Sequence, residues 1–428
     1  MSSPVEKFRD DLLAAWARSD ALFALVPQAA WRAQPIDLRH PILFYVGHLP
    51  AFAWNQIGRG ALDRPPLDPH LDALYARGID PESVECAQQH SPIGWPTVEE
   101  TLAYRDAVRA AVLRCLPEVF HRSNDILCEG GRVLRLVLEH EWMHHETLLY
   151  MLAESPPGLL QRPAAIAPPQ AGDGQAAEPR RVEAGPAVLG ASFSQLPFGW
   201  DNEFPQVTVS VPAFSIDSLP VRNRDWLAFF EGRGRPDALW PQGWARDARG
   251  QAPSPPMIKT LFGPLPFAAG AGFPVQVSGE QARVYCAWRG GRLATEAELH
   301  RAAYHTPDGS LRLHPWGDAP PGAEHGNFGF RHFHPTPVGQ FPAGDSAWGV
   351  GELVGNGWEW TQSPFAPRPG FVAWARTYPG YSADFFDGEH DIVFGASWAT
   401  ADGLLRRSFR NWYRRSYPFP FTSFRVVS

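Results

Sequence analysis

Apolar side chains recur every three to four residues in four stretches of the first 154 residues, which is the spacing of one helix face. We expect four helices, over residues 4–33, 40–60, 97–120 and 124–154. Thr97 and Glu100 form a capping-box pattern at the start of the third helix. Four helices of roughly 20–30 residues, joined by loops, are typical of a four-helix bundle.

The pattern changes after residue 154. Residues 155–181 are rich in Pro, Ala, Gly and Gln and lack periodic hydrophobicity, which predicts a linker that lies along the surface. From residue 182 short apolar runs alternate with turns, and we expect short helices over 223–232, over 278–289 and after Thr295. The sequence therefore predicts an α+β protein with a helical domain (1–154), a linker (155–181) and a mixed domain with little regular secondary structure (182–428).

Composition narrows the class of protein. A chain of 428 residues is longer than one hydrophobic core usually supports, which favours two domains. The net charge of −7 and the lack of a basic block argue against a nucleic-acid partner. We find no signal-peptide pattern and no apolar run of about 18 residues, so we expect a cytoplasmic protein without a transmembrane helix. The four scattered cysteines fit a reducing compartment, and the oligomeric state is not predicted.

The densest group of metal-ligand side chains lies in the fourth expected helix, over Leu138–Glu146. His140 and His144 are four residues apart, so a helix places both imidazoles on one face, where they can bind one metal ion. His48, in the second expected helix, completes a three-histidine set if these two helices are neighbours. Imidazole binds Fe, Zn, Cu and Ni alike, so the ligands alone do not identify the metal. His145 lies about 100° around the helix from His144 and is expected outside the set.

The same segment admits a second interpretation, because His140-Glu141-Trp-Met-His144 matches the H-E-x-x-H motif of zinc peptidases. Glu141 would then be the general base of a zinc hydrolase. Such an enzyme needs a third ligand farther along the chain, whereas here the helix soon reaches Ser155 and the linker. A non-catalytic binding module is the third possibility that the pattern leaves open.

Ordered motifs in the second half resemble the formylglycine-generating-enzyme-like (sulfatase-modifying-factor) domain. These motifs are Gly290–Glu298, His314–Asp318, Gly355–Thr361, Phe394–Trp398 and Ser408–Trp412. The resemblance implies a C-type-lectin-like fold for residues 182–428. True formylglycine generators use a cysteine pair in this domain, whereas Cys286 is the only cysteine after Cys128, which argues against that activity.

Together with a DinB-like bundle that carries the three histidines, this domain makes almost the whole chain resemble the ergothioneine-type sulfoxide synthases. The resemblance implies a mononuclear non-haem Fe(II) bound by His48, His140 and His144, with O2 as co-substrate and hercynine (N-trimethylhistidine) as substrate. It also implies a tyrosine that serves as acid and hydrogen-bond donor. We assign this role to Tyr381, which begins a Tyr-Ser-x-x-Phe-Phe-x-Gly pattern, with Tyr378 as the competing residue.

The resemblance further assigns two residues to the hercynine pocket. Asn411 and Trp412 match positions that line it, and an indole face attracts a trimethylammonium group through a cation–π interaction. Met143 lies within the ligand helix, at a position where ergothioneine synthases often carry Gln, and we expect it to face either this pocket or the bundle core.

The chalcogen donor is indicated by departures from the family pattern. Enzymes that use gamma-glutamylcysteine bind its carboxylates with Arg residues, but residues 78–96 contain no Arg or Lys, and Tyr413 replaces an Asp. Arg414 and Arg415 could bind these carboxylates in place of the missing Arg residues. A neutral, hydroxyl-rich donor would instead contact residues such as Gln88, Gln89, Trp95 and Tyr413. We therefore favour a selenosugar donor, as in the selenoneine synthases, with gamma-glutamylcysteine as the alternative.

Overall fold

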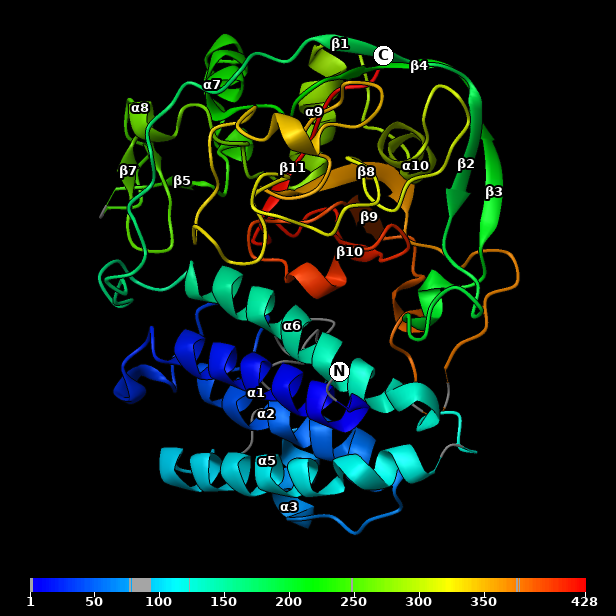
Figure 1. The fold of residues 1–428 in the computed structure, drawn as a ribbon. Coiled ribbons are helices and arrows are strands. Elements are labelled where there is room, and N and C mark those ends of the chain that lie inside the picture. The colour runs from blue at the N-terminus through cyan, green and yellow to red at the C-terminus, as the bar shows by residue number, and fades with distance from the viewer. Residues whose placement is uncertain are drawn as a thin grey trace. The chain divides into compact units, whose positions relative to one another are not determined.

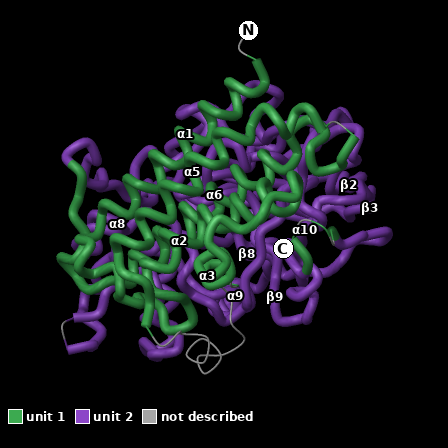
Figure 2. The backbone as a smooth tube through the Cα atoms, turned by 90° about the horizontal axis from the view of Figure 1, so that it is seen from below, with its two compact units in different colours: residues 1–163, 374–379 green, residues 164–373, 380–428 purple. Residues whose placement is uncertain are grey.

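The chain forms two compact units in the computed structural model, which describes residues 3–76, 78, 94–122, 124–247, 249–374, 376 and 378–428. Unit 1 comprises Met1–Pro163 together with Trp374–Pro379, and unit 2 comprises Ala164–Ala373 together with Gly380–Ser428. Figure 2 colours the two units separately. The expected linker 155–181 is thus divided between the units, and a short segment of the second half of the sequence belongs to unit 1.

Unit 1 is a helical bundle, as expected from the sequence (Figure 1). Its helices are α1 (Pro4–Phe23), α2 (Ile42–Trp54), α3 (Pro69–Leu74), α5 (Val98–His121) and α6 (Arg132–Leu152). Helix α1 packs against α5 and α6, and α2 packs against the same two helices. In the part of the chain that the structure describes, no helix is both long and apolar enough to cross a membrane.

Two expected helix ends are wrong, for local reasons. The first helix ends at Phe23 rather than at residue 33, because Pro27 disfavours the helical conformation in the residue before it. The fourth begins at Arg132 rather than at residue 124, because Gly130 and Gly131 have φ values of 60° and 72°. This left-handed region is open to glycine but does not occur within a right-handed helix.

Other boundaries follow the sequence pattern closely. Thr97 and Glu100 form the expected capping box, in which each side chain accepts a hydrogen bond from the other residue's backbone N–H. Helix α2 continues into a π-helical turn over Asn55–Ala61, so the expected range 40–60 describes both elements. The short helix α3 was not expected, although Asp68 caps it by accepting from two backbone N–H groups.

Unit 2 is a mixed domain built on a four-stranded sheet in the order β10-β9-β8-β11 (Figure 1). Its strands are β8 (Trp358–Pro364), β9 (His390–Phe394), β10 (Asn411–Arg414) and β11 (Thr422–Ser423), with only β11 running parallel to its neighbour. The small sheets pair β1 (Pro179–Val182) with β4 (Phe214–Asp217), β2 (Gly185–Leu189) with β3 (Val207–Val211), and β5 (Trp244–Ala245) with β6 (Met257–Ile258) and β7 (Leu265–Pro266).

The helices of unit 2 are short. They are α7 (Asn223–Gly232), α8 (Phe267–Gly270), α9 (Gly279–Trp288) and α10 (Glu296–Tyr304). The sequence predicted α7, α9 and α10, and the α+β class is confirmed.

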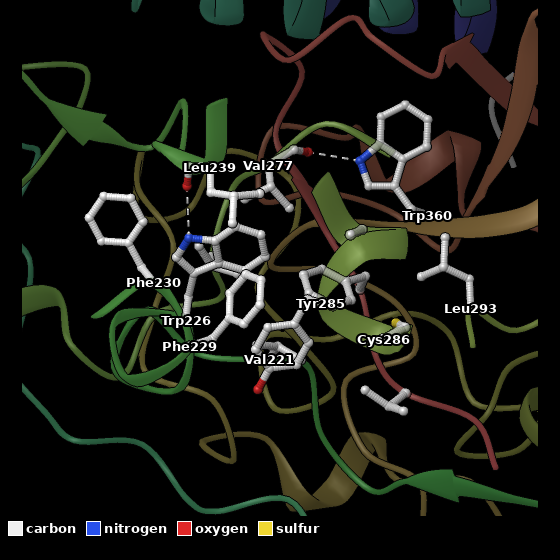
Figure 3. Packing of buried hydrophobic residues seen from close by; sticks show 14 of the residues in the cluster. Val221, Trp226, Phe229, Phe230, Leu239, Val277, Tyr285, Cys286, Leu293 and Trp360 are labelled. Atoms are coloured by element: carbon white, nitrogen blue, oxygen red, sulfur yellow. Dashed lines mark hydrogen bonds between the residues drawn. The ribbon is translucent and has the colours of Figure 1, made fainter. Parts of the chain in front are cut away.

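Tryptophan and phenylalanine fill the core of unit 2 (Figure 3). The indole of Trp226 stacks on Tyr285 with 5.5 Å between ring centroids, and its Nε1 donates to the carbonyl of Leu239 at 3.2 Å. The indole of Trp360 donates to the carbonyl of Val277 at 2.9 Å. Large rings bury much apolar area each, while their N–H groups satisfy loop carbonyls, so this loop-rich domain can maintain a core with little regular structure.

A buried ion cluster lies at the start of α10. The Glu296 carboxylate contacts Arg368 and Arg410, each at 3.0 Å, and all three side chains are buried. Burial alone raises the pKa of Glu296, but the charges of Arg410 and Arg368 outweigh this effect and lower the pKa to about 2. The carboxylate therefore stabilises the folded state at every pH above its ordinary pKa of about 4.5, and this contribution is lost as the pH falls through about 2.

We expect Glu296→Gln to lower the free energy of unfolding by about 3–5 kcal/mol at neutral pH, because it leaves two buried guanidinium groups without their anion. Chemical denaturation followed from neutral pH to about pH 2 measures both the loss and the flatter acid dependence of the variant. Glu183→Gln is the control, since its pair with Arg181 is exposed and worth at most about 1 kcal/mol. An E296Q protein as stable as the parent at neutral pH would contradict this account of the cluster.

Candidate metal centre

Three buried histidines of unit 1 converge on one point. His140 and His144 project from α6 and His48 from α2. The Nε2 atom of His144 lies 3.1 Å from that of His140 and 3.2 Å from that of His48. One ligand atom from each residue falls within 4.8 Å of the others, and among the described residues this is the group with metal-site spacing. The histidines that the sequence singled out are thus brought together.

The orientation of His48 follows from its burial. Every residue of α2 is buried, so an imidazole there has to find its hydrogen-bond partners inside the protein. Its Nδ1 donates to the backbone carbonyl of Tyr75 at 2.7 Å, which leaves Nε2 as the nitrogen with a free lone pair. Gly47 allows this contact, because a Cβ at that position would overlap the Tyr75 ring.

Electrostatics keeps the three imidazoles neutral. Burial lowers the pKa of His48 to about 4. The pKa values of His140 and His144 lie well below their ordinary range. Burial is the largest cause, and the nearby histidines are the next. Neutral imidazole is the form that binds metal ions.

The donor set fits a metal ion. Two nitrogens about 2.1 Å from one ion and about 95° apart would lie about 3.1 Å from each other, which is close to the two Nε2 separations of His144. A neutral imidazole carries one N–H, so a hydrogen bond at His144 Nε2 would satisfy at most one of these two contacts, whereas a cation would satisfy all three nitrogens. These three residues could therefore hold a divalent transition metal, although imidazole nitrogen does not identify which one.

Aromatic rings enclose the three histidines. Phe52 stacks on His140 with 3.5 Å between ring centroids, and Phe44 stacks on His48 at 5.0 Å. Tyr45 lies 5.9 Å from His144. These apolar neighbours restrict the ring planes of the ligands and exclude water from their sides.

Tyr378 is the tyrosine of the expected catalytic pair that lies beside the histidines within unit 1. Its ring is 5.5 Å from that of Phe52 and 6.4 Å from that of His140. Two residues earlier, Arg376 contacts both carboxylate oxygens of Asp125, at 3.1 and 3.5 Å, which ties this segment to the bundle.

Tyr381, which the resemblance favoured, belongs to an aromatic cluster of unit 2. It stacks on Trp200 with 4.2 Å between ring centroids and meets Trp412 edge-on at 5.4 Å. The next residue, Ser382, is held by Asp201 and by Asn202. The assignment of Tyr381 as the acid therefore stays a prediction. Tyr378 is the competing residue, because its ring lies beside the histidines within unit 1.

The expected substrate contacts of unit 2 share one strand, β10, which carries Asn411, Trp412, Tyr413 and Arg414. Trp412 stacks face to face on Phe365, with 4.0 Å between ring centroids. The Asn411 amide donates to the Tyr413 hydroxyl at 3.2 Å.

The arginines next to Tyr413 are matched by carboxylates. Arg414 contacts Glu389 at 3.4 Å, and Arg415 contacts Asp391 at 3.0 Å. Arg283 contacts the second oxygen of Asp391.

The remaining expected contacts lie in unit 1 or outside the described residues. Met143 is half-buried on α6, on the same helix as the two ligands. Trp95 is described, and its indole lies 5.9 Å from the Phe44 ring. Gln88 and Gln89 lie outside the described residues.

Sequence reasoning missed two features, one in the centre and one beside it. The acceptor for His48 is a backbone carbonyl, for which the sequence carries no side-chain signal. The second feature is a hydrogen-bonded group formed by Ser19, Glu141 and His145. Its signal was the four-residue spacing of Glu141 and His145, which repeats that of the two ligands.

Family models match most of the chain. Residues 165–428 match the sulfatase-modifying factor enzyme 1-like domain, and residues 11–148 match the DinB superfamily. The chain is 38% identical to a hercynine oxygenase of Mycolicibacterium smegmatis, over 82% of each chain. It is 36% identical to a hercynine oxygenase of Mycolicibacterium thermoresistibile, over 90% of this chain and 86% of that one. It is also 31% identical to ergothioneine biosynthesis protein 1 of Neurospora crassa, over 98% of this chain and 57% of that one.

Proposed function

The chain belongs to the hercynine oxygenase family and is an oxidoreductase that forms a carbon–chalcogen bond, and we propose that it joins hercynine to a selenosugar, as a selenoneine synthase. In this proposal His48, His140 and His144 hold Fe(II), and O2 is the co-substrate. The observation that carries the proposal is the buried, neutral three-histidine centre in a chain of this family. Fe(II) bound there would supply one-electron redox chemistry, with coordination positions left for O2 and for the donor.

The chain's own residues prepare this centre before any substrate binds. The hydrogen bond from His48 to the Tyr75 carbonyl fixes which nitrogen faces the metal position. The stacked rings of Phe44 and Phe52 restrict His48 and His140 to one orientation each. Such support means that little reorganisation is needed when the ion and substrates arrive.

A tyrosine hydroxyl is the proposed proton donor, because a phenol with a pKa of about 10 is protonated at neutral pH. We propose Tyr378 for this role, on the ground that its ring lies 6.4 Å from that of His140 in unit 1. This choice reverses the order suggested by the local sequence pattern, in which Tyr381 ranked first. The two residues differ in surroundings, so single variants can distinguish them.

Hercynine carries a trimethylammonium group and an imidazole, and the proposed contacts suit both. Trp412 and Tyr381 belong to one aromatic cluster, and aromatic rings attract a quaternary ammonium group. Asn411 provides an amide for the polar part of the substrate. Met143, one residue before His144 on α6, is the proposed apolar contact in unit 1.

The donor is proposed to be neutral because the positive charges that follow Tyr413 in unit 2 are already balanced. Arg414 pairs with Glu389, and Arg415 and Arg283 share Asp391. A dipeptide such as gamma-glutamylcysteine brings two carboxylates, which would have to displace these internal partners. A hydroxyl-rich selenosugar needs only hydrogen bonds, which Tyr413 and the balanced Arg414 are able to make.

The test offers both donors at once. The purified protein, supplied with Fe(II), O2 and hercynine, receives equal amounts of a selenosugar and gamma-glutamylcysteine, and the products are identified by mass. We expect the selenium product to dominate by about tenfold to a hundredfold, because carboxylates without charged partners lose about 1.5–3 kcal/mol of binding. Matched reactions without hercynine or without O2 should give no coupled product.

Two outcomes would overturn the proposal. If the main product were the sulfoxide that joins hercynine to gamma-glutamylcysteine, the chain would belong to the sulfur-using branch of its family. Peptide hydrolysis that needs zinc and no O2 would revive the H-E-x-x-H interpretation of His140-Glu141-Trp-Met-His144.

A further inference from the structure

Helix α6 carries a second pair of buried polar residues, which the metal centre does not use. Glu141 and His145 are 2% and 1% exposed. They are four residues apart, so they share a face, and this face lies about 100° around the helix from that of His140 and His144. A buried carboxyl group and a buried imidazole lower stability unless they are hydrogen-bonded, so their partners decide what they do.

The partners lie on one turn of α1. The Ser19 hydroxyl, which is fully buried, makes a close hydrogen bond to the Glu141 carboxyl group and lies 2.8 Å from His145 Nε2. His145 is also hydrogen-bonded to the backbone of Ala15, one turn before Ser19. One turn of α1 is thus hydrogen-bonded to one turn of α6, through Ser19 and through the backbone of Ala15.

These hydrogen bonds restrict the rotation of α6 about its own axis, which apolar packing alone leaves free. Packing of smooth apolar faces is non-directional, whereas hydrogen bonds hold only over a narrow range of distance and angle. Side chains extend about 6 Å from a helix axis, so a 10° rotation of α6 would move the imidazole nitrogens by about 1 Å. Metal–ligand distances tolerate about 0.2 Å, so the rotation of α6 has to be set within a few degrees.

Two other roles for this group conflict with its geometry. A hydrolytic Ser–His–acid triad needs an accessible serine and an acid bonded to the imidazole, but Ser19 is fully buried and Glu141 bonds to the serine instead. A general base for a metal-bound water needs a carboxylate directed at the metal, but the Glu141 carboxylate is engaged with Ser19 on α1.

We propose that Ser19, Glu141 and His145 form a polar clamp that sets the rotation of α6 and thereby the alignment of His140 and His144 on the metal ion. The clamp rests on the proposed function, since it acts through the three-histidine centre. Its members are positioning residues, and they have no direct contact with metal or substrate in this role.

The test measures metal binding rather than turnover. The full-length metal-free protein is titrated with Co(II), whose visible absorption reports the coordination geometry. Ser19→Ala and Glu141→Ala should raise the Co(II) dissociation constant by about 10- to 100-fold, the usual cost of losing a partner outside the ligands. They should also change the shape of the absorption band. Glu141→Gln should stay within about threefold of the parent, because its amide still bonds to Ser19.

A matched control separates alignment from general stability. Leu12→Ala removes a buried side chain from the same helix α1 without removing a hydrogen bond, so it should lower the melting temperature and leave the Co(II) spectrum unchanged. All titrations are made at temperatures where circular dichroism shows a folded protein. If Ser19→Ala does not fold, the comparison of E141A with E141Q decides the question.

The outcomes distinguish the clamp from the centre itself. Ser19→Ala and Glu141→Ala proteins with the parent's dissociation constant and spectrum would overturn the clamp and leave the proposed function intact. A Glu141→Gln protein as impaired as Glu141→Ala would also overturn it, since the carboxylate itself would then matter. A parent protein that does not bind Co(II), or binds it equally well after His48→Ala, would overturn the proposed centre.

Discussion

Replacing His48 with alanine should abolish both metal binding and turnover, because it removes one of the three converging nitrogens. We expect the metal dissociation constant to rise by more than about 100-fold, since loss of a partner outside the ligands alone costs about 10- to 100-fold. Metal content per protein after reconstitution with Fe(II), and coupled product formed per minute, measure the two losses. His48 is the informative ligand because it lies outside the H-E-x-x-H motif.

The control for this substitution is His121→Ala, which removes an exposed histidine from the end of α5 and should change neither quantity. The three interpretations left open by the sequence then separate. If the His48→Ala protein keeps the parent's metal content and neither protein couples hercynine, the result would favour a zinc hydrolase built on His140, His144 and a different third ligand, or a binding module without catalysis. Loss of O2-dependent coupling together with loss of metal would support the three-histidine centre.

Replacing Tyr378 with phenylalanine should reduce the rate of coupling by about 10²- to 10⁴-fold, the usual contribution of a positioned proton donor. Phenylalanine keeps the ring that lies 5.5 Å from Phe52, so the change removes the hydroxyl and little else. The metal content should be unchanged. Steady-state rates of product formation, recorded beside O2 consumption, show whether O2 is still reduced when coupling fails.

Tyr381→Phe is the matched substitution, because it also removes one hydroxyl and keeps the ring stacked on Trp200. We expect it to keep most of the coupling rate, with its main effect on the Michaelis constant for hercynine through the neighbouring Trp412. The opposite result, in which Tyr381→Phe fails and Tyr378→Phe works, would return the acid role to the residue that the sequence pattern indicated. Equal, small effects of both variants would contradict a tyrosine acid altogether.

Sequence by itself determined the features that depend on local spacing. The helical period placed His140 and His144 on one face, and the capping box at Thr97 marked the start of α5. The ordered motifs of the second half identified a sulfatase-modifying-factor-like domain. These predictions succeeded because hydrogen bonds within a helix, and family motifs, involve residues close together in the chain. Helix ends set by glycine conformation or by Pro27 were the local features that periodicity missed.

Only the tertiary structure decided which distant residues meet. His48 faces His144 across 96 positions because α2 and α6 pack together, and helix periodicity carries no information about neighbours. The same holds for Tyr378, whose segment belongs to unit 1, and for Glu141, which the H-E-x-x-H motif suggested as a base and which bonds instead to Ser19. Such contacts depend on the order and rotation of packed helices, which are set by the complete core rather than by any one segment.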